Sequence, residues 1–450
     1  MLPGCVHYQE SPLAPPASAA AFAARRLDDP RLRLELQRVL ARDLRNWPLD
    51  RWDRDELLAA ALLRNPELAT VQAQIDQALA HELAAARPTN PGVTLQSEYA
   101  RQEARPWLYG IGLDLPLRPT ERSVAQRLAR IESANSRWHY LEQTWAVRRD
   151  LTEALSGWEG VRRRLDLLDR LAADQERLQE LEQRRIAAGE DAPAAIVPVE
   201  TARLDIEQQH VQALIDLSTA QAAAARALGV APAAVQGLSL NWPDWGEPPP
   251  LDASDGRERE RALLSRSDLA EAIGEYGLAE TELKLAVSRQ YPRIDVEPGY
   301  YWDHGIAKWP FDLGFTLPID GNRGEIAEAR AARELAGRRM LALQADIIGQ
   351  ISAAERAEGR LRDAAAVAEQ ELQAARRDVA HHALALRLGD TGLEESLAAD
   401  IVAIRAELEL LRTRGQLQRA RNQLEDALHM PLSGPELSLL RAARPPVPGS

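Results

Sequence analysis

The chain has 450 residues, a formal net charge of −13 and a single cysteine. The acidic balance argues against a nucleic-acid partner, because no net basic field exists to attract phosphates, and one cysteine excludes an internal disulfide framework. The sequence is rich in alanine, leucine, arginine and glutamate with only 5% aromatic residues, which favours long helices and coiled coils over a compact enzyme core.

At the N-terminus, Leu2-Pro3-Gly4-Cys5 resembles the end of a bacterial lipoprotein signal. We interpret residues 1–4 as a signal-peptide remnant and Cys5 as a site of lipid attachment, such as palmitate, although the charged and apolar regions of a signal are missing. A chance match in a terminal segment is the alternative. Residues 5–53 then form an N-terminal lead, with a short helix predicted over 31–44.

The first repeated unit is assigned to residues 54–228. A helix is predicted over 54–86, with Asp53 as its N-cap and prolines beyond its end. A β-hairpin is predicted over 93–117, because apolar and polar residues alternate there on both sides of a polar turn.

The same plan returns in the second half of the chain. Landmarks recur about 200 positions later, a two-fold internal repeat with a period far above that of solenoid arrays. Pro91 is matched by Pro292, and Gly189 by Gly389. Residues 258–430 are therefore assigned to a second unit, in which a helix precedes a hairpin over 293–319.

Both hairpins have features typical of membrane strands. Each strand is about 9–10 residues long, one face is apolar, and small or acidic residues occupy the other. Aromatic residues gather toward the turns, as in an interfacial girdle. The girdle residues are Tyr99, Trp107, Tyr109, Tyr300, Trp302 and Trp309. A soluble hairpin packed on a helix is the alternative, and no transmembrane helix is predicted.

Four strands are too few to close a barrel in a membrane, so the sheet requires further copies of the chain. Two copies would supply 8 strands and three would supply 12, and the sequence pattern itself leaves both open.

Long helix pairs follow the hairpins, over 120–228 and 323–428. Apolar residues recur there every three or four positions, as in coiled coils. The first helix of each pair spans on the order of 100 Å and ends at Gly189 or Gly389, where glycine suits a left-handed C-cap. An equatorial linker over 229–257 joins the repeats, and the C-terminal tail, 431–450, is similar in composition to its start.

Together these features resemble the TolC-type outer-membrane efflux proteins, and in particular their lipoprotein subgroup. The resemblance covers residues 54–430 and rests on the duplicated plan, the tips and the strand-to-helix passage Phe315–Gly324. The matching passage Leu115–Arg122 lacks the usual glycine. The resemblance implies a homotrimer in which an α-barrel of long coiled-coil helices continues into a 12-stranded transmembrane β-barrel, four strands from each chain.

The function implied by the resemblance is conduction and not catalysis. The chain would be the outer-membrane channel of a tripartite efflux system, passing drugs, toxic organics or metal cations from an inner-membrane pump and a periplasmic adaptor. It would lie in the outer membrane, in contact with its lipid, and extend into the periplasm. A conduit for protein or peptide secretion and a structural periplasmic coiled-coil lipoprotein are the alternatives.

No enzyme site, cofactor or metal site is predicted; His381 and His382 are adjacent and therefore do not face one another on a helix. The resemblance places a periplasmic gate at Glu394 and Glu395, whose family counterparts form a ring of carboxylates. A second family acid is replaced by Ala398. Residues expected to dock an adaptor at the tips are Arg185, Gly189, Arg387 and Gly389.

Overall fold

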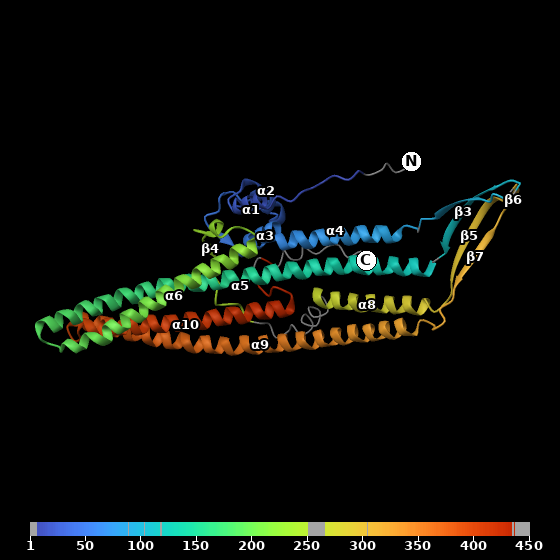
Figure 1. Cartoon of the computed structure of the whole chain (residues 1–450). Helices are drawn as coiled ribbons and strands as arrows, with labels where there is room; N and C mark the ends of the chain where they lie inside the picture. The colour runs from blue at the N-terminus through green and yellow to red at the C-terminus, as the bar shows by residue number, and fades with distance from the viewer. Residues whose placement is uncertain are drawn as a thin grey trace. The chain divides into compact units, whose positions relative to one another are not determined.

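The computed structural model describes residues 7–88, 90–102, 104–117, 119–250, 266–303, 305–433 and 436 (Figure 1). The chain forms two compact units. Unit 1 contains Met1–Pro66, Thr144–Arg259 and Gly349–Ser450, and unit 2 contains Glu67–Gln143 and Glu260–Ile348. Each unit therefore combines segments from both sequence repeats.

The helices, in chain order, are α1 Pro15–Ala23, α2 Pro30–Leu40, α3 Arg54–Arg64, α4 Pro66–Ala86, α5 Pro119–Ala188, α6 Ile196–Leu228, α8 Ser267–Ser288, α9 Arg323–Leu388 and α10 Leu393–Leu428, with short 3₁₀ turns at Pro193–Ala195 and Pro232–Val235. The strands are β1 Trp52–Asp53, β2 Gly92–Tyr99, β3 Trp107–Leu117, β4 Leu240–Asn241, β5 Arg293–Asp303, β6 Ile306–Lys308 and β7 Phe311–Thr316. Among the described residues, no helix has a stretch both long and apolar enough to cross a membrane.

The strands of unit 2 form one antiparallel sheet in the order β2, β3, β5, with β6 and β7 both paired to the far side of β5. Its register aligns the alternating apolar residues of neighbouring strands. Leu95 lies opposite Ile111, and Ile111 lies opposite Tyr300. The two hairpins thereby share a single apolar face. That face is open: Leu95 is 78% exposed and Phe315 is 59% exposed.

Small and acidic residues lie on the opposite face of this sheet. Tyr301 belongs to that face and its ring covers Gly110, where a Cβ atom would lie 2.0 Å from the ring. Asp114 and Asp295 lie on the same side by their strand positions. The two faces therefore differ in polarity as the sequence predicts.

Within the hairpin predicted over 293–319, the returning strand is divided at Trp309 and Pro310 into β6 and β7. Proline has no N–H to donate to a ladder, so pairing fails there, although the Pro310 carbonyl still accepts from Gly299 N at 2.9 Å. The register is the same on either side of the gap, with Tyr301 opposite Lys308 and Pro298 opposite Phe311.

The single helix predicted over 54–86 is also wrong. Asn65 separates α3 from α4 with an extended backbone, φ −65° and ψ 123°, because Pro66 disfavours the helical conformation of the residue before it. The predicted cap at Asp53 is present as a capping box: its N–H donates to the Glu56 carboxylate at 2.9 Å. The helix predicted over 31–44 ends at Leu40, where Ala41 takes a left-handed conformation.

The helix break is where the N-terminal lead attaches within unit 1. The Arg25 guanidinium donates to Arg64 O at 3.0 Å and to Gly229 O at 2.9 Å, so one cation satisfies carbonyls at the ends of α3 and α6. Asn65 donates to Ala227 O at 2.9 Å. The lead also includes helix α1, which the sequence pattern did not predict.

The helical hairpins of unit 1 pack through apolar side chains that recur along their facing stripes. One buried cluster joins α5, α6 and α10, and its members are Leu167, Leu171, Ile206, Ile401 and Ile404. A second cluster joins α9 and α10 and contains Ala368, Leu372 and Leu410. These contacts confirm the coiled-coil character predicted from the stripes.

Further along unit 1, a buried ionic network ties α5 to the end of α10. Arg148 is 1% exposed and contacts the carboxylates of Glu425 and Glu436, the latter at 2.8 Å. Burial alone would lower the pKa of Arg148, but Glu436 and Glu425 outweigh it and raise that pKa above its usual value. The guanidinium therefore remains charged, and the chain beyond α10 is held by Glu436.

Part of the linker is fixed in the same unit by Trp245. Its indole N–H donates to Ser156 O at 3.1 Å, and the ring lies against Gly160 of α5 and Gly415 of α10. The Arg163 guanidinium lies over the ring, 5.0 Å from its centroid. The predicted lipid site Cys5, residues 251–257 of the linker, the start of the second repeat at 258–265 and most of the tail lie outside the described residues.

Candidate functional site at the helical tips

The predicted tips lie in unit 1, where α5 and α9 reverse into the helices that follow (Figure 1). Gly189 has φ +79° and Gly389 has φ +80°, the left-handed conformation that glycine adopts without strain. After α5, Glu190 N donates to Arg185 O at 2.9 Å; after α9, Asp390 N donates to Ala385 O at 2.9 Å. The two repeats therefore end their long helices in the same way, and the predicted C-caps are confirmed.

Arg185 is the main charged centre of the tips. Its Nε lies 2.8 Å from the Asp191 carboxylate, and its Nη1 forms an ion pair with Glu394 at the start of α10. The second contact joins residues from different hairpins. Arg185 is only 35% exposed on its side chain, so this pair is partly shielded from solvent.

Glu395 has a local role in the structure. Its Oε2 accepts from Gly392 N at 3.0 Å and completes a capping box at the start of α10. A carboxylate there also interacts favourably with the positive end of the helix dipole. Glu394 and Glu395 are thus adjacent in sequence but held by different partners.

Of the residues predicted at the tips, Arg387 does not join this centre. Arg387 Nε donates to Ala383 O at 3.1 Å within its own helix. The rings of His381 and His382 are 5.8 Å apart between centroids, and His382 Nε2 lies 3.8 Å from Asp378. The structure therefore brings Arg185 and Glu394 together and leaves Arg387 separate.

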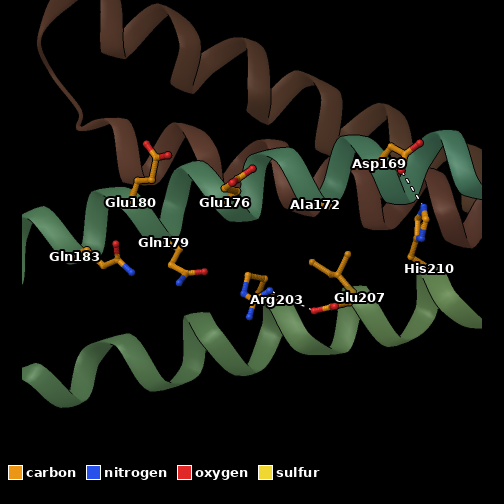
Figure 2. A pocket seen from close by; sticks show the side chains of 10 residues that line it. Asp169, Ala172, Glu176, Gln179, Glu180, Gln183, Arg203, Glu207 and His210 are labelled. Atoms are coloured by element: carbon orange, nitrogen blue, oxygen red, sulfur yellow. Dashed lines mark hydrogen bonds and ion pairs between the residues drawn. The ribbon is translucent and has the colours of Figure 1, made fainter.

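An acidic groove lies between α5 and α6 beside the tip (Figure 2). It has a volume of about 590 Å³. Figure 2 shows Gln179 of α5 facing Arg203 and Glu207 of α6, while His210 reaches the Asp169 carboxylate at 3.1 Å. Arg203 is paired with Glu207 at 3.3 Å. Glu176 and Glu180 add further negative charge to the lining.

The sequence pattern missed a second charged site, which lies on the same helical hairpins but farther from the tip glycines. Asp400, Glu407 and Arg170 line one cavity between α5, α9 and α10. The signal was present: Asp400 lies among the apolar positions Leu397, Ile401 and Ile404, where a half-buried acid requires partners.

In unit 2, the predicted aromatic girdle forms two contacting groups on the sheet. Tyr99 and Trp107 are opposite one another with ring centroids 4.9 Å apart, and Tyr109 lies opposite Trp302. Tyr300 contacts Trp309 at 4.7 Å. The members share the apolar face, at the turn end of the strands. Their role at a membrane interface stays a prediction.

No family model and no curated protein matches the sequence. Solved structures match at low identity. The outer membrane protein VceC from Vibrio cholerae superimposes with a TM-score of 0.69 at 15% identity, over 84% of this chain and 97% of VceC. A membrane protein from Pseudomonas aeruginosa gives 0.69 at 19% identity, over 83% and 92% of the two chains. The outer-membrane channel OprN gives 0.69 at 15% identity, over 91% and 94%. The chain therefore has the fold of TolC-type outer-membrane channels, and the predicted mostly helical fold with a small β part is confirmed.

Proposed function

We propose that this protein is the outer-membrane channel of a tripartite efflux system, assembled as a homotrimer and working with a periplasmic adaptor and an inner-membrane pump. The observation that carries the proposal is the antiparallel sheet of β2, β3, β5, β6 and β7, in which β6 and β7 together take the place of a fourth strand. One face is apolar and exposed, the other is lined by glycine, acidic residues and Tyr301, and β2 lies at the edge of the sheet. Such a sheet can lie in the hydrocarbon of a membrane only if strands from other copies of the chain pair with its edges, because unpaired backbone groups there are too costly.

The sheet polarity supports a water-filled interior. In a closed barrel of three sheets, the apolar face would contact lipid and the face bearing Asp114, Asp295 and Tyr301 would line the lumen. Sheets from three copies would give the 12 strands expected from the resemblance.

The tip geometry supports a gate made by Arg185 and Glu394. Their ion pair ties the end of α5 to the start of α10, so separation of the two hairpins requires that the pair break. Glu395 would contribute to this gate by fixing the start of α10, since its carboxylate accepts from Gly392 N. In this proposal it does not act as a member of a free ring of carboxylates. The tips around Gly189 and Gly389 and the acidic groove of Figure 2 are the surfaces we propose for the adaptor.

The test is conductance of the purified protein in planar bilayers. Arg185→Met and Glu394→Gln should each enlarge or prolong the openings, and the double variant should add little, since both remove the same pair. Arg184→Met is the matched control, because Arg184 is on the same helix, is 77% exposed and pairs with Glu180 of that helix. A bilayer that stays sealed with every variant would refute the channel, while equal openings in all variants would refute this gate alone.

A further inference from the structure

A cavity of about 440 Å³ lies where α5, α9 and α10 meet in unit 1. It is distinct from the tip: Arg170 and Arg185 are 15 residues apart on α5, about 22 Å along the helix. The charged residues that line it are Arg170, Asp174, Arg177, Arg376, Asp400 and Glu407. Three cations and three acids therefore line one cavity beside the buried core.

Glu407 holds the three helices together across this cavity. Its Oε2 lies 3.3 Å from Arg170 Nη1 of α5, and its Oε1 lies 3.7 Å from Arg376 Nη2 of α9. One carboxylate on α10 is thus shared by cations from the two neighbouring helices. The apolar contacts of Leu171 with Ile404 lie in the core cluster next to it.

Two further acids, Asp174 of α5 and Asp400 of α10, line the same cavity. Asp174 of α5 is 16% exposed on its side chain and is paired at 3.0 Å with Arg177. Asp400 of α10 is half-buried, and burial followed by the negative charge of Asp174 raises its pKa above the usual aspartate value, although Arg170 and Arg177 act in the opposite direction. Asp400 therefore binds a proton more tightly in the packed arrangement than it would in open water.

We propose that Asp174 and Asp400 make the packing of α10 on α5 sensitive to acid, so that acidification of the surrounding compartment holds the two helices together. The reasoning follows from linkage. In the packed state Asp400 binds a proton more tightly than it would beside open water, so lowering the pH through its raised pKa stabilises the packed state. Raising the pH ionises Asp400, restores its repulsion with Asp174 and favours separation.

The charged groups that face Asp400 are accounted for on each helix. From α5 it faces Arg170, Asp174 and Arg177; Arg376 of α9 lines the same cavity, and Glu407 is on α10 itself. Glu407 is shared between Arg170 and Arg376, whereas Asp400 faces the like charge of Asp174 across the cavity.

The helix separation can be measured without any conductance. Nitroxide labels at Glu180→Cys of α5 and Val402→Cys of α10, with Cys5→Ser, place both probes at positions more than half exposed. Labelled chains are diluted with unlabelled chains so that pulsed electron resonance reads the distance within one chain. We expect the longer-distance population to fall about two- to fivefold relative to the shorter one as the pH is lowered, the range given by one weak ion–ion contact.

Variants separate repulsion from attraction. Asp400→Asn should give the short distance at every pH, and Asp174→Asn should shift the distribution the same way because it removes the other half of the pair. Asp166→Asn is the control, because Asp166 is an acid on α5 that is 68% exposed and does not line the cavity. In this variant the distance between the labels should change with pH as in the unmodified protein. An Asp400→Asn protein that lengthens the distance, or one that keeps the full pH response, overturns the proposal.

The link to transport rests on the proposed function and is measured separately. In bilayers we expect fewer openings at acidic pH, and an Asp400→Asn channel that opens rarely at all pH values. A pH-dependent distance in a protein that never conducts would support the helix contact and refute the channel. If the protein conducts but the distance between the labels does not change with pH, the channel is supported and the acid-sensitive contact between α5 and α10 is refuted.

Discussion

Arg148 is on α5, and replacing it by methionine should destabilise the end of α10 more than any substitution at an exposed position of α5. The guanidinium is 1% exposed and lies between Glu425 and Glu436, which are 3% and 2% exposed. Methionine keeps most of the side-chain volume, so the loss is mainly electrostatic. Two buried carboxylates would remain, with the nearest other cations, Arg421 and Arg54, each 3.9 Å away.

Removing one partner of a buried ionic pair typically costs about 3–5 kcal/mol, because the remaining charge stays desolvated. Local opening of the segment from Arg421 to Glu436 should become about a hundredfold more frequent or greater, since each 1.4 kcal/mol is about a factor of ten. Amide hydrogen exchange followed by mass spectrometry measures this directly. Peptides from the ends of α5 and α6 near Gly189 should be unchanged, because they do not contact Arg148.

Two further variants test the cause. Arg148→Met combined with Glu425→Gln and Glu436→Gln should recover most of the protection, since the two carboxylates that faced Arg148 are then no longer buried charges without their main partner. Arg184→Met, 77% exposed, should change the free energy of opening by less than about 1 kcal/mol. If Arg148→Met also costs less than about 1 kcal/mol, or the triple variant is worse than the single one, the buried network does not hold this segment.

Two glycine pairs give sharper comparisons. Gly229→Ala should lower the thermal midpoint of unfolding more than Gly237→Ala. Both positions have a left-handed backbone, which costs a residue other than glycine about 1–2 kcal/mol. Only at position 229 would the new Cβ also lie 2.4 Å from a backbone oxygen, that of Arg64 in α3. Gly110→Ala should destabilise the sheet by about 1–3 kcal/mol because the Tyr301 ring must move, whereas at Gly112 that residue comes no closer than 3.7 Å. Equal melting temperatures within either pair, measured by circular dichroism, would contradict the steric explanation.

The sequence predicted the parts of this fold that depend on local pattern. The period-two alternation gave the strands and the polarity of their faces, and the three-to-four spacing gave the helices up to Gly189 and Gly389. The errors came where one residue overrides a longer pattern. Pro66 breaks a helix whose apolar stripe continues on both sides, because it disfavours the helical conformation of Asn65. Pro310 divides a strand for another reason, because it has no N–H to donate.

The ionic contacts could not be read from the sequence for a different reason. Arg148 and Glu425 are 277 positions apart, and Arg185 and Glu394 are 209 apart. The chain has 55 basic and 68 acidic residues, so composition offers thousands of possible pairs and none is marked by local spacing. Only the packing of helices from both repeats selects the few that meet. Asp400 is the exception, because an acid within an apolar stripe is visible without a structure.

The internal duplication explains why the tips match in backbone but not in charge. Gly189 and Gly389 are equivalent, so the counterpart of Arg185 in the second repeat is Ala385, and the counterpart of Glu394 in the first is Ala194. A perfectly repeated chain would have two reciprocal ion pairs between its tips; this one has a single pair, with alanine at both reciprocal positions. One pair is easier to break than two, because a second charge contact would add its own free energy to every separation of the hairpins. The divergence of the repeats therefore leaves the rigid coiled-coil framework unchanged while it reduces the link between α5 and α10 at the tip to one replaceable contact.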